Sequence, residues 1–94
     1  MKIIWSPRAQ RDLARIVDRI VRDKKGAALQ WVRAVYKKVS RLQRFPQSGR
    51  IVPEVGRTDL REILVGRYRV IYKVGPSLSI LTIFHGAKEL KKMD

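Results

Sequence analysis

The sequence predicts a single α+β domain over residues 1–94, in which a helical hairpin packs on a small antiparallel sheet. Three observations support this prediction. Apolar residues recur every three to four positions through residues 7–23 and 27–44, as in amphipathic helices. Apolar and polar residues then alternate in three short segments that Gly and Pro separate. A short apolar segment precedes the helices, so the order is β-α-α-β-β-β, two layers around one core.

The first strand is expected at residues 2–5, directly before the first helix. Ser6 suits the N-cap, and Pro7 suits the first helical position, where its missing N–H has no partner to lose. The opposite face of the helix carries arginines that acids one turn away partly neutralise, so we interpret it as solvated. The expected buried face comprises Ala9, Leu13, Ile16, Val17, Ile20 and Val21, and the expected pairs are Arg8–Asp12, Asp18–Arg22 and Arg19–Asp23.

The second helix is expected after the "DKKG" break, and its polar face is entirely basic. Apolar positions recur on the other face from Ala28 to Leu42. The following segment, "FPQSGRIVPEVGRTD" at residues 45–59, has no period and is rich in Gly and Pro, which predicts a loop. Long loops in compact domains are usually functional.

Three strands are expected at residues 60–65, 68–74 and 78–84, joined by tight turns at Gly66 and "GPS" into an antiparallel meander. The helices would cover one face of this sheet. The other face would be partly open and would carry Arg69 and Lys73. Residues 85–94 are expected to form a mobile basic tail or a short terminal turn.

Charge is the strongest compositional signal. The chain has 22 Lys and Arg against 8 Asp and Glu, a formal net charge of +14, which favours an anionic partner. It has no cysteine and one histidine, so we expect no disulfide, no metal and no cofactor. No segment reaches membrane-spanning length and no signal peptide is evident, so we expect a cytoplasmic protein without a membrane partner.

Four residues of the strand-and-loop half would suit metal-free cleavage of RNA by its own 2′-hydroxyl. Arg61 and Arg69 would stabilise charge on the phosphate, His85 would exchange a proton, and Glu54 would act as a base. Spacing alone favours a purely structural role for each residue taken singly. Two other interpretations stay open: a module that docks an acidic protein segment, and a nucleic-acid binder without catalysis.

Four segments together resemble the RelE/ParE superfamily of bacterial toxins, in order and over nearly the whole chain. These are "WSPRAQRDLARIVDRI", "LQRFPQSGRIVPE", "LREILVGRYRVIYKV" and "ILTIFHGAKEL". The resemblance implies the toxin of a type II toxin–antitoxin pair, which a cognate antitoxin neutralises. It also implies that the toxin contacts operator DNA only through the antitoxin. Residues expected to contact a partner are Arg61, Arg69, Lys73, Lys88, Lys91 and Lys92.

The superfamily divides by target, and "WSP", "FPQSGR" and "REILVGRYRVIY" look more like the ParE branch, which inhibits DNA gyrase. The alternative is the RelE branch, which cuts mRNA on the ribosome. Under that alternative, Arg69 and His85 match positions that some nucleases use, and Glu54 matches an acidic residue used by others. No tyrosine follows Tyr72, so the C-terminal tyrosine of many nuclease members is absent.

Overall fold

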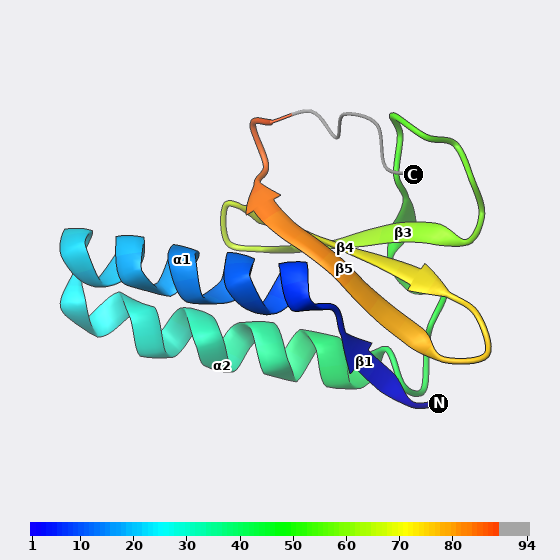
Figure 1. Cartoon of the computed structure of the whole chain (residues 1–94), viewed down its shortest axis with the longest axis horizontal. Helices are drawn as coiled ribbons and strands as arrows, with labels where there is room; N and C mark the ends of the chain where they lie inside the picture. Colours follow the sequence, from blue (N-terminus) through cyan, green and yellow to red (C-terminus); the bar gives the residue numbers. More distant parts are fainter. Residues whose placement is uncertain (89–94) are drawn as a thin grey trace.

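Two helices pack against one face of a five-stranded sheet in the computed structural model, which describes residues 1–88 (Figure 1). This confirms the predicted α+β architecture. Within these residues, neither helix has the length and apolar character needed to cross a bilayer. The elements are β1 (Ile3–Trp5), α1 (Pro7–Asp23), α2 (Lys25–Arg41), β2 (Arg50–Ile51), β3 (Leu60–Val65), β4 (Tyr68–Val74) and β5 (Leu78–His85).

The sheet has the order β1-β5-β4-β3-β2 and contains the predicted antiparallel meander β3-β4-β5. Gly66 turns the chain between β3 and β4 with φ of 59°, a conformation that glycine adopts readily. The sheet is mixed rather than wholly antiparallel, because β1 pairs in parallel with β5. In addition, β2 lies inside the predicted loop and pairs with β3 at the other edge. A strand of two or three residues is too short for its alternation to reveal its partner.

The start of α1 agrees with the sequence prediction. The Ser6 side chain accepts a hydrogen bond from the Ala9 N–H at 3.0 Å, and Pro7 follows at the first helical position. The break between the helices is tighter than expected, since only Lys24 leaves the helical conformation and α2 begins at Lys25. The helix then ends at Arg41, three residues before the predicted end.

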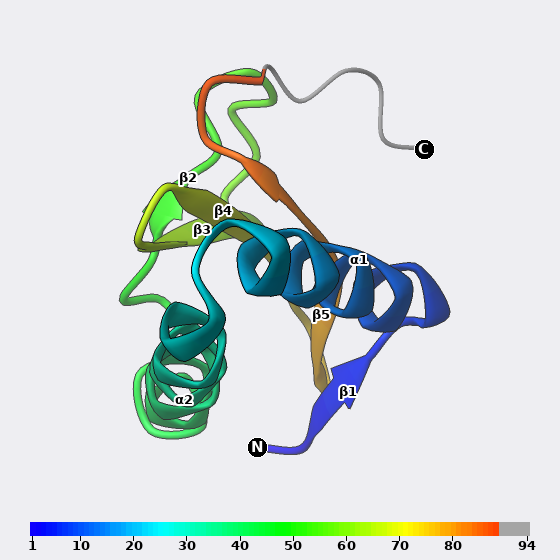
Figure 2. The same ribbon diagram turned by 90° about the vertical axis from the view of Figure 1, so that its left-hand side faces the viewer.

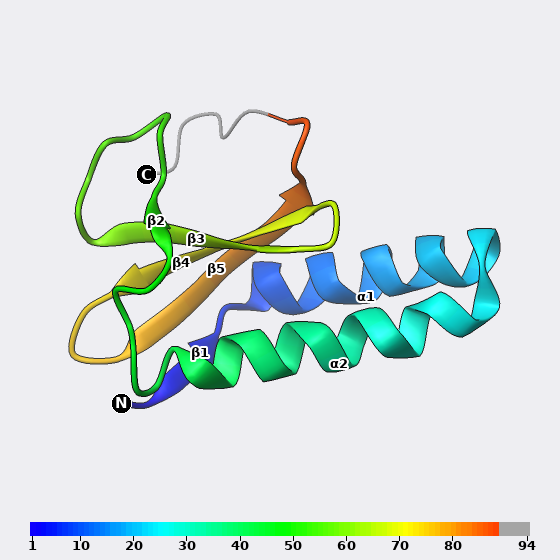
Figure 3. The same cartoon turned by 180° about the vertical axis from the view of Figure 1, so that it is seen from behind.

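The main core lies between the helices and the inner face of the sheet, which is the face that the helices cover (Figure 2). Val35, Tyr72 and Ile80 are fully buried there. The far end of the helical hairpin extends past the sheet (Figures 1 and 3). Val21 was expected on the buried face but is 41% exposed, because the sheet does not reach this end of α1.

A second apolar cluster lies on the outer face of the sheet. Val52 and Val55 of the loop pack there with Leu60 and Ile71. Leu60 and Ile71 are buried, so the face expected to be partly open is covered in this part by the loop. The apolar residues of the loop explain this, since they would otherwise be exposed to water.

Asp12 joins α1 to β5 from a buried position. Its Oδ2 atom accepts hydrogen bonds from the Thr82 hydroxyl at 2.6 Å and the Ile83 N–H at 3.0 Å, and its Oδ1 atom pairs with Arg15 at 2.6 Å. The sequence prediction placed Asp12 on the solvated face in a pair with Arg8. The predicted Asp18–Arg22 pair is confirmed, at 2.9 Å.

Candidate functional site

Arg69 on β4 is buried at the centre of a partly exposed cluster of charges on the outer face. Its Nη1 and Nη2 atoms donate to the two carboxylate oxygens of Glu54 at 2.7 and 2.8 Å. Its Nε and Nη2 atoms donate to Oε1 of Glu62, the first at 3.0 Å. Nη1 also donates to the Lys88 carbonyl at 3.0 Å. Hydrogen bonding to Glu54, followed by the bonds and charge of Glu62, raises the pKa of Arg69 against the opposing effect of burial.

Glu62 on β3 is shared between two arginines. Its Oε2 atom accepts from Arg50 of β2 at 2.6 Å, while Oε1 accepts from Arg69. The guanidinium carbon of Arg69 lies 5.1 Å from the centre of the Phe84 ring, a cation–π contact. Two positive and two negative side chains therefore tie the loop, β2, β3 and β4 together.

Arg61 is half-buried and anchors the loop. Its Nη1 atom donates to the carbonyls of Gln47 at 3.1 Å and Gly49 at 3.0 Å, and its Nε atom donates to the Thr58 carbonyl at 3.1 Å. Arg61 pairs in register with Tyr72 of the neighbouring strand β4, and the side chain of Tyr72 belongs to the inner-face core. Because successive strand residues point to opposite faces, Arg61 and Glu62 point away from each other.

Tyr72 of the inner-face core binds the same loop through its hydroxyl group. Its hydroxyl donates to the Pro46 carbonyl at 2.8 Å and accepts from the Gly49 N–H at 2.9 Å. Burial raises the pKa of Tyr72, and the Gly49 hydrogen bond and the Arg61 charge oppose that rise.

His85 is the last residue of β5 and is exposed. Its Nδ1 atom accepts a hydrogen bond from the Ala87 N–H at 3.1 Å, and its ring packs edge-on against Tyr68 with 5.6 Å between ring centres. Lys73 and Lys88 are also exposed. Lys91 and Lys92 lie outside the described residues.

The four residues proposed for RNA cleavage do not share one site. Glu54 and Arg69 are bonded to each other on the outer face. Arg61 and His85 pair in register with Tyr72 and Tyr68, which are four residues apart on β4. At about 3.3 Å per strand residue, this separation is about 13 Å along the strand. The structure thus brings Glu54 and Arg69 together, whereas Arg61 and His85 lie far from each other.

Two functional features were not found from the sequence. Glu62 was not singled out from the sequence, although this residue lies diagonally opposite Arg69 on the same face of the sheet. Opposite charges at diagonal positions of two adjacent strands were the sequence signal that could have predicted this ion pair. The other missed feature is the surface beside the loop.

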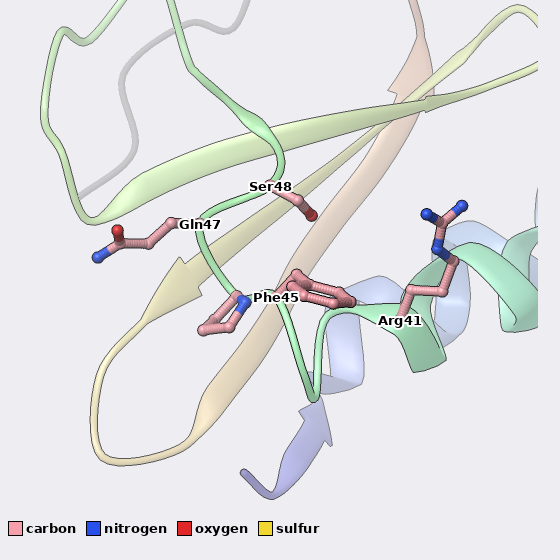
Figure 4. Close-up of a pocket in the computed structure, with 5 residues that line it drawn as sticks. Arg41, Phe45, Gln47 and Ser48 are labelled. Atoms are coloured by element: carbon pink, nitrogen blue, oxygen red, sulfur yellow. The ribbon is translucent and has the colours of Figure 1, made fainter.

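We call this second feature the α2–β2 surface. One hollow of about 490 Å³ is lined by Arg41, Phe45, Pro46, Gln47 and Ser48 (Figure 4). A neighbouring hollow of about 410 Å³ shares Arg41 and Ser48 and adds Lys38, Leu42, Gly49, Arg50, Glu62, Ile63 and Leu64. Phe45 is 58% exposed and Leu64 is 50% exposed. Exposed apolar groups between cations suit an acidic, amphipathic segment of another chain.

A family model described as the ParE toxin of the type II toxin–antitoxin system parDE matches residues 3–90. The chain belongs to the ParE toxin family. The solved structure of a chromosomal ParDE toxin–antitoxin system from P. aeruginosa is similar to this chain, with a TM-score of 0.74 and 25% identity over 90% of this chain and 95% of that one. No curated protein matches the sequence.

Within residues 1–88, no three His, Cys, Asp or Glu side chains gather closely enough to hold a metal ion. The acidic residues Glu54 and Glu62 are instead bonded to arginines. The described site therefore consists of a charge cluster, an anchored loop and the basic, partly apolar α2–β2 surface.

Proposed function

We propose that this member of the ParE family is the toxin of a type II toxin–antitoxin pair, that it inhibits DNA gyrase, and that a cognate antitoxin neutralises it. The family match over residues 3–90 supports the assignment to the toxin class. The choice of gyrase over mRNA depends on the geometry of the four residues considered for cleavage.

The observation that carries this choice is the separation of those four residues. A metal-free ribonuclease needs its base, acid and phosphate-stabilising groups around one phosphate. Here Glu54 and Arg69 neutralise each other on the outer face, while Arg61 points to the inner face and is bonded to loop carbonyls. This arrangement favours action by surface binding over cleavage of mRNA.

We further propose that the antitoxin binds the α2–β2 surface. Residues 24–53 carry basic side chains and no acid, so this surface attracts an acidic segment. Lys73 and Lys88 add exposed positive charge at other places on the molecule. In this proposal Arg61 and Arg69 act by holding the loop and the strands that shape the surface.

The function is tested by two assays run with the same purified protein. Supercoiling of relaxed plasmid by gyrase and ATP should fall as the protein is added, while translation in a cell-free extract continues. An unrelated protein of similar size and net charge controls for non-specific binding to the plasmid. Loss of translation with intact supercoiling would overturn the gyrase proposal and support the mRNA endonuclease.

The antitoxin proposal has a separate test. A small protein encoded beside this gene should co-purify with the chain and restore supercoiling. Arg41→Glu reverses one charge at the centre of the α2–β2 surface and should weaken this complex, whereas Arg11→Glu on the exposed part of α1 should leave it intact. Equal effects of the two variants would place the antitoxin elsewhere.

A further inference from the structure

The end of β5 lies beside α1 (Figure 1). A pocket of about 350 Å³ is lined by residues from the middle of α1 and the end of β5. Residues lining it include Arg15, Arg19, Tyr68, Ile83, His85 and Lys88. Its volume falls within the range of about 300–1,000 Å³ that is typical of small-ligand sites. The function proposed above does not use this pocket.

The pocket is positively charged. Arg15, Arg19 and Lys88 contribute three cations, and no carboxylate lies among its described lining residues. Asp12 pairs with Arg15 at 2.6 Å and is itself bonded to β5, so it holds the Arg15 guanidinium beside the pocket. The Arg15 side chain remains 71% exposed. A guanidinium has five N–H donors, and one bond to Asp12 leaves donors for a ligand.

His85 adds an N–H donor to this wall. Its Nδ1 atom accepts from the Ala87 N–H, so a neutral imidazole carries its hydrogen on Nε2. The ring is held edge-on against Tyr68, which in turn packs edge-on against Trp31 with 5.2 Å between ring centres. The aromatic side of the pocket is therefore fixed by packing rather than by the cations.

We propose that this pocket binds a nucleotide, with its phosphate between Arg15, Arg19 and Lys88 and its base or sugar against Tyr68. Arginine is suited to phosphate because its planar donors match phosphate oxygens in pairs. The pocket is larger than a phosphate ion, and its apolar and aromatic side would take up the remaining space. The net charge of +14 would raise the local concentration of such anions.

The nucleotide could be free or part of a single strand, since both offer the same phosphate. Binding is measured by fluorescence anisotropy with labelled ten-nucleotide single-stranded DNA and RNA, and by NMR titration of the ¹⁵N-labelled protein with AMP and, separately, with inorganic phosphate. Arg19→Gln removes one cation from the pocket. Arg33→Gln is the matched control, because it removes one exposed arginine from α2, outside the pocket.

Arg19→Gln should weaken binding about tenfold, because it removes one charge-assisted hydrogen bond to the phosphate. Arg33→Gln should change the affinity less than about twofold. His85→Phe keeps the ring and removes the donor, and should also weaken binding. Thermal unfolding of each variant checks that the fold is intact. AMP should shift the amide signals of residues 15, 19, 68 and 85, and inorganic phosphate should shift them less.

Binding of AMP at these residues supports a free nucleotide, and binding of only the oligonucleotide through Arg19 supports a strand. Equal losses for Arg19→Gln and Arg33→Gln would overturn the proposal, because they would show non-specific attraction. Shifts by inorganic phosphate as large as those by AMP would overturn the role of Tyr68. None of these outcomes depends on gyrase, so this test and the supercoiling assay fail independently.

Discussion

Arg69 and Glu62 pair with each other inside the protein: two guanidinium nitrogens of Arg69 donate to one carboxylate oxygen of Glu62. The Glu62 side chain is fully buried and that of Arg69 is 6% exposed. A buried carboxylate is tolerated only while cations and donors compensate it, so each partner depends on the other.

Replacing Arg69 by alanine should therefore destabilise the fold by about 3–5 kcal/mol, because it leaves Glu62 with one arginine and Glu54 without its bidentate partner. Urea unfolding followed by circular dichroism measures this loss. Arg67→Ala, at an exposed position of the neighbouring turn, is the control and should change stability by less than about 0.5 kcal/mol. Similar losses for both variants would refute the structural role of Arg69.

Tyr72→Phe should cost about 1–3 kcal/mol at pH 8, because it removes both hydrogen bonds between the hydroxyl and the loop at Pro46 and Gly49. Urea unfolding of the variant and the parent chain measures the difference. An unchanged midpoint would show that the loop is held without the hydroxyl.

The same residue predicts a pH dependence. The folded pKa of Tyr72 is raised, so its contribution to stability is complete below the unfolded pKa of about 10. It is lost as pH rises further, because the unfolded chain releases the proton first. The stability difference between the parent chain and Tyr72→Phe should therefore narrow above about pH 10, and a constant difference up to pH 11 would contradict the raised pKa.

Two glycines should respond in opposite directions to alanine. A Cβ atom at Gly49 would lie 2.5 Å from the Tyr72 hydroxyl and 2.6 Å from the Glu62 carbonyl oxygen, so the loop or β3 would have to move. We expect a loss of about 1–3 kcal/mol. Gly26→Ala meets no atom within 4 Å at the start of α2 and should stabilise the chain by about 0.5–1 kcal/mol. Thermal unfolding midpoints of the two variants test both signs.

Asp12→Ala should destabilise the protein by about 2–4 kcal/mol, because the buried Thr82 hydroxyl and Ile83 N–H lose their acceptor. Asp18→Ala removes an exposed carboxylate of the same helix and should cost less than about 1 kcal/mol. Chemical denaturation of both variants compares the two sites. If they lost equal stability, Asp12 would not be the link between α1 and β5.

Local patterns predicted the helices and the meander well, because each of these elements has its own apolar period and stop signals. Ser6, Pro7 and Gly66 mark boundaries that the structure places where the sequence predicts them. The parallel pairing of β1 and the short β2 depend on contacts between distant segments, which no local period records.

Side-chain roles were harder to predict than elements. Asp12 sits on a helix rich in arginines, and its sequence neighbours suggest a solvated pair, yet the end of β5 offers it two donors. Arg69 was identified as a notable residue from its strand position, but its partners Glu54 and Glu62 come from the loop and another strand. Sequence patterns do not predict such clusters, because their members lie far apart along the chain. Alternation along a strand predicts only which face of the sheet each side chain occupies.

The sharing of Glu62 between Arg50 and Arg69 also bears on how this chain can evolve. Arg69 and Glu62 are the buried members of this trio, so exchanging either one alone removes charge compensation inside the protein, and substitutions at these two positions should arise together among related toxins. Relatives that have lost Arg69 or Glu62 are expected to carry an apolar or amide residue at the other position, whereas the exposed Arg50 can vary by itself.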